Sequence, residues 1–219
     1  MPLARHAAAI RGAQHLLASA GPLAADGTWE RIWRTLLGAL DAQGKLVWAQ
    51  AFLDGSFVPA KRGAQPSGLT RKGTKWMVVV EGHGAPIGVL LASAQRAEIT
   101  LAPATLATVR VPSRQGRPRT RPRQLVADRG YDSRSFRRSL RQRGIRPCIP
   151  PRRLQGRRRP GRPLHSFPRE YACRWIVERT FAWLGNYRRL LVRHEHLISV
   201  YHGFFLLACV LICLARILG

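Results

Sequence analysis

The chain has 219 residues, enough for one sizeable domain with a short attachment. Its 37 Lys and Arg residues against 11 Asp and Glu residues give a net charge of +26, and 46% of its residues are apolar. This apolar content is enough for a core and argues against wholesale disorder, while the positive charge makes a polyanion, DNA or RNA, the expected partner.

The cysteines and the N-terminal residues bear on the compartment. Cys148, Cys173, Cys209 and Cys213 form no CxxC pair and fit no zinc spacing. Cys209 and Cys213 lie four apart inside an apolar run, so these two are expected to be buried free thiols in a reducing cytosol. Residues 1–25 are expected to be a weakly structured leader. They are not expected to form a signal peptide, because Gly, His and Gln interrupt the apolar stretch.

The first half of the chain predicts a helix followed by strands. Apolar residues recur at helical spacing from Asp26, a capping residue, to about Gly44. Strands are then expected at 46–52, 76–80 and 87–93, with a hairpin turn at 81–86 and a basic loop at 61–75. A helix at 99–109 closes this half.

The second half alternates short strands with helices. The expected elements are a basic linker at 110–123, a strand at 125–127, a basic helix at 135–143 capped by Asp132 or Ser133, a strand at 146–149, an Arg/Pro/Gly loop at 150–168, and helices at 171–190 and 200–218. Apolar residues 204–215 are fewer than the roughly 20 that span a membrane, so the last helix is expected in the core. The element order predicts an α/β fold with a mixed sheet flanked by helices and a long basic loop before the helix at 171–190.

Three carboxylates stand where an active site would need them. Asp54 and Asp128 follow predicted strands, and carboxylates at strand ends face the crevice where α/β sheets bind ligands. If those two strands are neighbours, the two aspartates come together, and Glu178 could join them from its helix. The plainer alternatives are a turn or cap role for each Asp and an i,i+4 ion pair between Arg174 and Glu178.

The chemistry that suits three acids in a basic chain is phosphoryl transfer with two Mg²⁺ ions, in which Mn²⁺ could substitute. One ion would activate the attacking water or 3′-hydroxyl, and the other would stabilise the leaving oxygen. Glu81 and Glu98 could also face a metal, but a hairpin turn and a helix N-terminus explain them. His83, His194 and His196 have no partner at metal spacing and are expected at the surface.

The motifs around these acids resemble those of DDE transposases, most closely the bacterial insertion-sequence-five family and its relatives. They are LDGS with Asp54, VADRGYDS with Asp128, and YACRWIVERTFAWLGNYRRL with Tyr171, Arg174 and Glu178. The last motif is highly specific, the second moderately so and the first weak by itself. The likeness runs from about Asp26 to the C-terminus.

The resemblance implies an RNase H-like catalytic domain in which Asp54, Asp128 and Glu178 hold two divalent ions. It also implies that Tyr171 and Arg174 support Glu178 and contact the DNA at the end of the transposon. The related pattern has a basic residue seven positions after the glutamate, where this chain has Gly185, so Arg188 or Arg189 is expected to substitute.

The expected domains are a leader with an amphipathic helix at 1–44, short for the family, and the catalytic domain at 45–219. The chain could then be a second reading frame joined to a first by frameshifting, or a decayed remnant.

The sequence therefore predicts a transposase that cleaves and transfers DNA strands in the bacterial cytoplasm, on the nucleoid. Its partners would be terminal inverted repeats, target DNA and a second copy of the chain, with an upstream-frame product as a further partner and no membrane. The basic loop before the Glu178 helix, through Arg157, Arg158 and Arg159, is expected to track the phosphate backbone. The alternatives are an inactive DNA-binding remnant, a ribosomal-type RNA-binding protein and, for the loop, a solvated segment.

Overall fold

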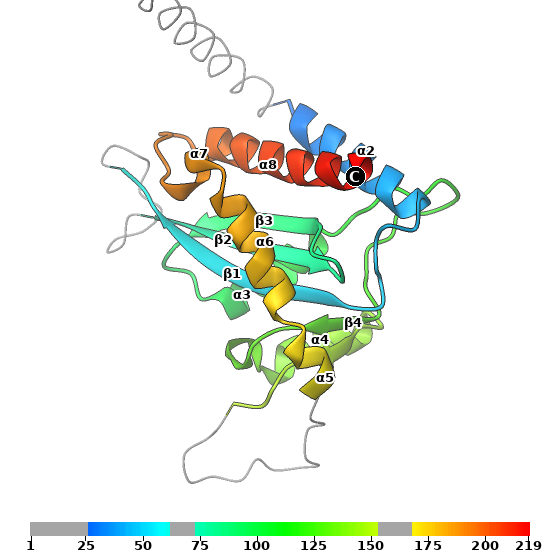
Figure 1. Cartoon of the computed structure of the whole chain (residues 1–219). Helices are drawn as coiled ribbons and strands as arrows, with labels where there is room; N and C mark the ends of the chain where they lie inside the picture. The colour runs from blue at the N-terminus through cyan, green and yellow to red at the C-terminus, as the bar shows by residue number, and fades with distance from the viewer. Residues whose placement is uncertain (1–25, 62–72, 153–167) are drawn as a thin grey trace, which may run out of the picture.

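The computed structural model describes residues 26–61, 73–152 and 168–219. Its centre is a mixed five-stranded sheet with the order β3-β2-β1-β4-β5 (Figure 1). The strands are β1 (Ala51–Pro59), β2 (Gly73–Glu81), β3 (Pro86–Ser93), β4 (Gln124–Val126) and β5 (Arg146–Cys148). Strand β2 runs antiparallel to its two neighbours β1 and β3, whereas β4 runs parallel to both β1 and β5. The predicted mixed α/β sheet is confirmed.

Helices cover both faces of this sheet. They are α2 (Thr28–Ala42), α3 (Glu98–Ala107), the 3₁₀ turn η1 (Arg129–Tyr131), α4 (Arg134–Gln142), α5 (Pro168–Ala172), α6 (Trp175–Gly185), α7 (Arg188–Leu191) and α8 (Ile198–Leu218). Helix α6 crosses one face of β1, α3 packs on β2 and β3, and α2 lies along α8 (Figure 1). The sheet therefore lies between helical layers.

Strand β2 forms the middle of the core. It pairs with β1 on one side and β3 on the other, and all its residues except Lys75 are buried. A strand covered on both faces needs a continuous apolar run, and the sequence supplies one from Trp76 to Val80.

Helix α8 is a core helix of 21 residues, longer than the apolar run suggested. Among the described residues, it is the one helix that is long and apolar enough to cross a membrane by length and composition alone. Half of its apolar 18-residue stretch is buried inside the protein. Its aromatic side chains fit a core role. Phe205 packs edge-on against Trp76, and the hydroxyl of Tyr201 donates a hydrogen bond to the carbonyl of Leu190. Packing therefore accounts for its apolar sequence.

The expected boundaries of the first strand are wrong. Residues 46–50 form a connection, in which the amide of Val47 donates to the Glu81 carboxylate and Trp48 Nε1 donates to Asp41. The strand instead runs through Asp54 and Gly55 to Pro59, because β2 offers it a ladder of that length. Asp54 thus stands inside a strand rather than after one.

The expected continuous helix at 171–190 is also wrong, since the segment breaks into α5, α6 and α7. At the first break the amide of Arg174 bonds to Tyr171 O and the amide of Val177 bonds to Arg174 O, which is the tighter i to i+3 pattern. The side chains of Tyr171, Glu178 and Arg189 consequently belong to three separate helices.

Asp132 does not cap the basic helix. The N-cap residue of α4 is Ser133, and its hydroxyl faces that of Ser135. Asp132 instead accepts from Arg137 Nε at 2.9 Å in a buried ion pair and from the amide of Arg152 at 2.6 Å. It therefore fixes the segment that follows Asp128.

The remaining predicted elements are confirmed within a few residues, as are the free thiols: all four cysteines are unpaired, and Cys209 and Cys213 are buried. The predicted leader at 1–25, most of the basic loop at 61–75 and most of the Arg/Pro/Gly loop, with Arg157, Arg158 and Arg159, lie outside the described residues.

Candidate active site

Asp54 lies within β1, and Asp128 follows β4, the parallel strand beside it, as the N-cap residue of η1. The last paired residues of β1 and β4 are Phe52 and Val126, and each aspartate lies two residues beyond its strand's paired residue. The adjacency that the sequence made conditional on strand order is therefore present. Both carboxylates are held locally, since Asp54 Oδ1 accepts from the Gly55 amide at 2.9 Å and Asp128 Oδ1 from the Gly130 amide at 2.7 Å.

Glu178 joins the two aspartates through a shared cation. The guanidinium of Arg174 lies 3.3 Å from Asp54 Oδ2, 3.7 Å from Asp128 Oδ2 and 3.1 Å from Glu178 Oε1. The i,i+4 pair between Arg174 and Glu178 is thus real, but it is one arm of a cluster that also includes both aspartates. The structure brings all three predicted acids to one place.

The three acids differ in exposure. The side chain of Asp54 is 14% exposed, that of Asp128 38% and that of Glu178 60%. Burial raises the pKa of Asp54 to about 6, against the lowering effect of the Arg174 charge and the Gly55 amide, and the Asp128 and Glu98 carboxylates raise it further. Asp54 is therefore the acid whose charge depends most on a nearby cation.

This donor set fits hard divalent cations. Carboxylate oxygens are the protein ligands that Mg²⁺ and Mn²⁺ accept, and here three of them already surround a positive charge. Across the described ranges no group of three or more His, Cys, Asp or Glu is closed up tightly enough to hold a metal ion by itself. The two observations agree, because the acids converge on the Arg174 guanidinium rather than on one another.

Glu98 and Tyr131 form a second layer behind Asp54. Successive strand residues face opposite sides, so Asp54 faces α6 while Gly55 faces α3, where a Cβ atom would lie 2.6 Å from Glu98 Cδ. Tyr131 Oη donates to Glu98 Oε2 at 2.8 Å, and Lys75 Nζ lies 3.5 Å from Glu98 Oε1. Burial, followed by the Glu98 charge, raises the pKa of Tyr131 well above its usual value.

Sequence reasoning missed this pair. It attributed Glu98 to a helix N-terminus, and Glu98 does lie in the first turn of α3. The available signal was Tyr131, three residues after Asp128 in the VADRGYDS motif. The pair links the N-terminus of α3 to η1, which immediately follows Asp128, and Glu98 also contacts the strand of Asp54. It therefore ties together the segments that carry the two aspartates.

The other residues considered as metal ligands have structural roles or lie at the surface. Glu81 is fully buried and accepts backbone hydrogen bonds in the β2–β3 turn, as the turn explanation predicted. His83, His194 and His196 are exposed, also as predicted.

The predicted DNA-contacting residues fall into two groups. Tyr171 lies at the edge of the acid cluster, with its ring 6.0 Å from the Arg174 guanidinium. Arg188 and Arg189 lie on α7, beyond the C-terminal end of α6 and beside α8 (Figure 1). Arg188 is exposed, whereas Arg189 pairs with Glu195 at 2.6 Å and lies over the Phe204 ring. Of the two expected substitutes for a basic residue at Gly185, Arg188 is the more available.

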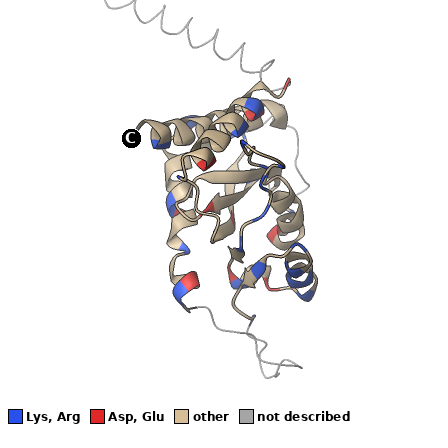
Figure 2. Ribbon diagram, turned by 90° about the vertical axis from the view of Figure 1, so that its right-hand side faces the viewer, with Lys and Arg blue, Asp and Glu red and all other residues tan. Residues whose placement is uncertain are grey.

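Cations are dense elsewhere on the molecule. Figure 2 shows them concentrated on α4 and on the connection that precedes β4. Arg134, Arg138 and Arg141 are exposed along α4, which begins six residues after Asp128. Exposed positive charge therefore follows Asp128 closely along the chain.

Comparison with known proteins agrees with this geometry. A family model described as a transposase DDE domain matches residues 50–213, a span that includes all three acids. A Burkholderia cepacia protein, described as a transposase for insertion sequence element IS402, is 39% identical over 154 residues, which cover 70% of this chain and 68% of that protein. DDE transposases act on DNA and generally use divalent metal ions. The chain belongs to the DDE transposases of bacterial insertion sequences, and its mixed sheet with flanking helices is the RNase H-like fold of that family.

Proposed function

We propose that this protein cleaves the ends of an insertion sequence and joins the freed strands to target DNA, with Asp54, Asp128 and Glu178 as its catalytic carboxylates. The observation that carries the proposal is the convergence of these three acids on one cationic group at 3.1–3.7 Å. Residues 45–219 would form the catalytic domain, and residues 1–44 would precede it.

The three carboxylates would hold two Mg²⁺ ions, with Mn²⁺ as a substitute. Bound there, divalent cations supply activation of the attacking oxygen and stabilisation of the leaving oxygen. In cleavage, a water oxygen forms a bond to the phosphorus, the bond from phosphorus to the 3′-oxygen breaks, and that oxygen leaves with the electron pair and is protonated. In strand transfer, the freed 3′-hydroxyl loses its proton, attacks a target phosphorus and displaces the 3′-oxygen of the target strand.

The chain's own residues prepare this site for an anionic substrate. Asp54 and Asp128 are fixed by the Gly55 and Gly130 amides, so they need little rearrangement to act as ligands. Arg174 would give up its ion pairs with the carboxylates to bound cations, and its guanidinium, beside Tyr171, would then be available to a phosphate of the DNA end. Arg188 and Arg189 would extend this contact, and Arg157, Arg158 and Arg159 would follow the backbone from the preceding loop.

Two DNA ends must be held together before both are cut, so the active form would contain at least two copies of the chain on the nucleoid.

The test of the proposed function is cleavage of a labelled duplex that carries the flanking inverted repeat, with Mg²⁺, Mn²⁺ or EDTA, by the wild type and by Glu178→Ala. Inspection of the flanking DNA supplies that repeat and shows whether an upstream frame is present.

Metal-dependent nicking at the repeat end, lost by at least about 10³-fold in the variant, is the expected result, since the metal site is incomplete without Glu178. Tight DNA binding without nicking by the wild type would contradict the proposal and identify an inactive DNA-binding protein.

A further inference from the structure

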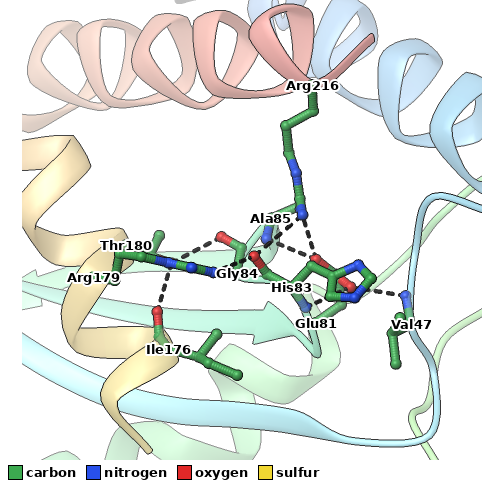
Figure 3. A network of polar contacts seen from close by, with 9 residues as sticks. All are labelled: Val47, Glu81, His83, Gly84, Ala85, Ile176, Arg179, Thr180 and Arg216. Carbon is green, nitrogen blue, oxygen red and sulfur yellow. Dashed lines mark hydrogen bonds and ion pairs between the residues drawn. The ribbon is translucent and has the colours of Figure 1, made fainter. Parts of the chain in front are cut away.

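Glu178 stands on a helix that must be held against the sheet at a defined rotation. The two residues that follow it both bond to the β2–β3 turn, residues 81–86 (Figure 3). Thr180 is fully buried, and its hydroxyl donates to Gly84 O at 2.8 Å. Arg179 Nη2 donates to His83 O at 2.8 Å. The turn therefore contacts α6 immediately beside the glutamate.

The shape of this turn is set by the buried carboxylate of Glu81. Its two oxygens accept hydrogen bonds from the backbone amides of Val47 at 2.8 Å, His83 at 2.9 Å and Ala85 at 2.8 Å. These bonds curl the backbone around the carboxylate, and the carbonyls of His83 and Gly84 serve as acceptors for α6 (Figure 3).

Side chains of helix α6 pack directly against the backbone of the turn at Gly84. Gly84 has a φ of +91°, which residues with a Cβ atom rarely adopt. A Cβ atom there would lie 2.9 Å from Thr180 Oγ1 and 3.4 Å from Ile176 Cγ2. The glycine thus allows both the turn conformation and the close seating of the helix.

Arg216, near the end of α8, completes the arrangement. Its Nη1 lies 2.8 Å from Glu81 Oε1, and its Nη2 donates to His83 O at 3.2 Å (Figure 3). A carboxylate buried without a countercharge is strongly disfavoured, and Arg216 places its guanidinium against the Glu81 carboxylate that shapes the turn. The His83 carbonyl receives both Arg179 and Arg216, which links α6 to α8 through one acceptor.

We propose that Thr180 and Arg216 are positioning residues for Glu178, acting through the β2–β3 turn, which serves as the docking site for α6. The inference rests on the proposed catalytic role of Glu178 and adds residues outside the three acids. Asp54 and Asp128 are placed by the sheet ladder and local amides, whereas Glu178 would be placed by these contacts. Loosening the turn would move Glu178 away from the two aspartates while leaving those aspartates in place.

The test compares four variants: Thr180→Val, Thr180→Ser, Arg216→Gln and Arg34→Gln. Valine keeps the shape of Thr180 without the hydroxyl, and serine keeps the hydroxyl. Arg34→Gln is the matched control, because Arg34 also bridges backbone carbonyls and a glutamate: it donates to Thr108 O at 2.8 Å and Arg110 O at 2.9 Å and pairs with Glu30 at 3.0 Å. It does so from α2, away from α6.

Two readouts distinguish positioning from general stability. They are the affinity for Mn²⁺ without DNA, and the separate kcat and KM values for cleavage of the repeat-end duplex. Thr180→Val and Arg216→Gln are expected to weaken Mn²⁺ binding about tenfold and to lower kcat about 10- to 100-fold with little change in KM, as residues supporting metal ligands generally do. Thr180→Ser should stay close to the wild type, and Arg34→Gln should change both quantities less than about twofold, since neither removes a hydrogen-bonding group that contacts the turn.

If Thr180→Val and Arg216→Gln behave like Arg34→Gln at matched thermal stability, the inference is overturned. A wild type that neither binds Mn²⁺ nor cleaves would instead overturn the proposed function. The positioning role is then decided by hydrogen exchange: faster exchange of α6 amides in Thr180→Val and Arg216→Gln, but not in Arg34→Gln, supports it, and unchanged α6 exchange contradicts it.

Discussion

The two halves of the acid cluster are held in different ways. Asp54 and Asp128 extend from neighbouring parallel strands and accept hydrogen bonds from amides one and two residues away. Glu178 is 60% exposed on α6, and its nearest polar partner is Arg174 on the preceding turn. Two acids thus belong to the sheet, and the third is placed by a helix.

This difference shows where the site can adjust. A strand position is fixed by its ladder, which cannot shift by one residue without exposing buried side chains. A helix held by a few side chains can shift or rotate at lower cost. We therefore expect Asp54 and Asp128 to keep their places, and the position of α6 to decide whether Glu178 reaches them.

The largest loss of stability is expected when the segment that follows Asp128 is loosened. Asp132→Ala removes one partner of the buried pair with Arg137, whose two side chains are 1% and 6% exposed, and should cost about 3–5 kcal/mol in the free energy of unfolding. Urea denaturation measures this loss. Glu178→Ala, at an exposed position, should change the same free energy by less than about 0.5 kcal/mol. Equal losses in the two variants would show that both halves are held alike.

A smaller effect follows from the charge on Asp54. Its pKa lies near 6 in the folded protein against 3.8 for an unperturbed Asp, so the folded state binds the proton more tightly. The metal-free protein in EDTA should therefore lose stability as pH rises from about 4 to about 6 and change little from this group above that. Asp54→Asn should remove this slope and raise stability at pH 7 by on the order of 1–3 kcal/mol.

Denaturation at a series of pH values tests this expectation, with Glu178→Gln as the matched control. That variant alters an exposed carboxylate and should retain the wild-type slope between pH 4 and pH 6. A wild-type profile that is flat over this range, or an Asp54→Asn profile that keeps the slope, would contradict the assignment of the buried charge to Asp54.

The meeting of Asp54 and Asp128 could be predicted from the sequence only on the condition that their strands are neighbours, and the observed strand order fulfils that condition. The extent of β1 could not, because Asp-Gly-Ser is typical of a turn, and only the partner strand β2 carries the ladder through it. The break before Arg174 was equally hidden, since no Pro or Gly marks it. Glu81 and Arg216 meet across 135 residues, and no local pattern encodes such a contact.

The sharpest test of how the halves are joined is Arg174→Gln, whose main effect is expected on binding rather than on stability. Arg174 links both halves, and two of its three partners, Asp128 and Glu178, are 38% and 60% exposed, so each of these two ion pairs is worth less than about 1 kcal/mol in the free energy of unfolding. Its third partner, Asp54, is largely buried. Its guanidinium competes with a divalent cation for the same oxygens. The variant should therefore bind Mn²⁺ several-fold more tightly in the absence of DNA. The affinity is measured at pH 8, because loss of the positive charge raises the pKa of Asp54.

The matched control is Arg188→Gln, which removes an exposed arginine on α7 and should leave Mn²⁺ affinity unchanged. The same Arg174→Gln variant should bind the repeat-end duplex less tightly, since it lacks a phosphate contact. Tighter metal binding together with weaker DNA binding would mean that Arg174 is released from the acids when the DNA end arrives, so that DNA binding and metal loading are coupled. Weaker Mn²⁺ binding would instead mean that Arg174 holds the three carboxylates together as a support, and that α6 needs it to bring Glu178 to the sheet.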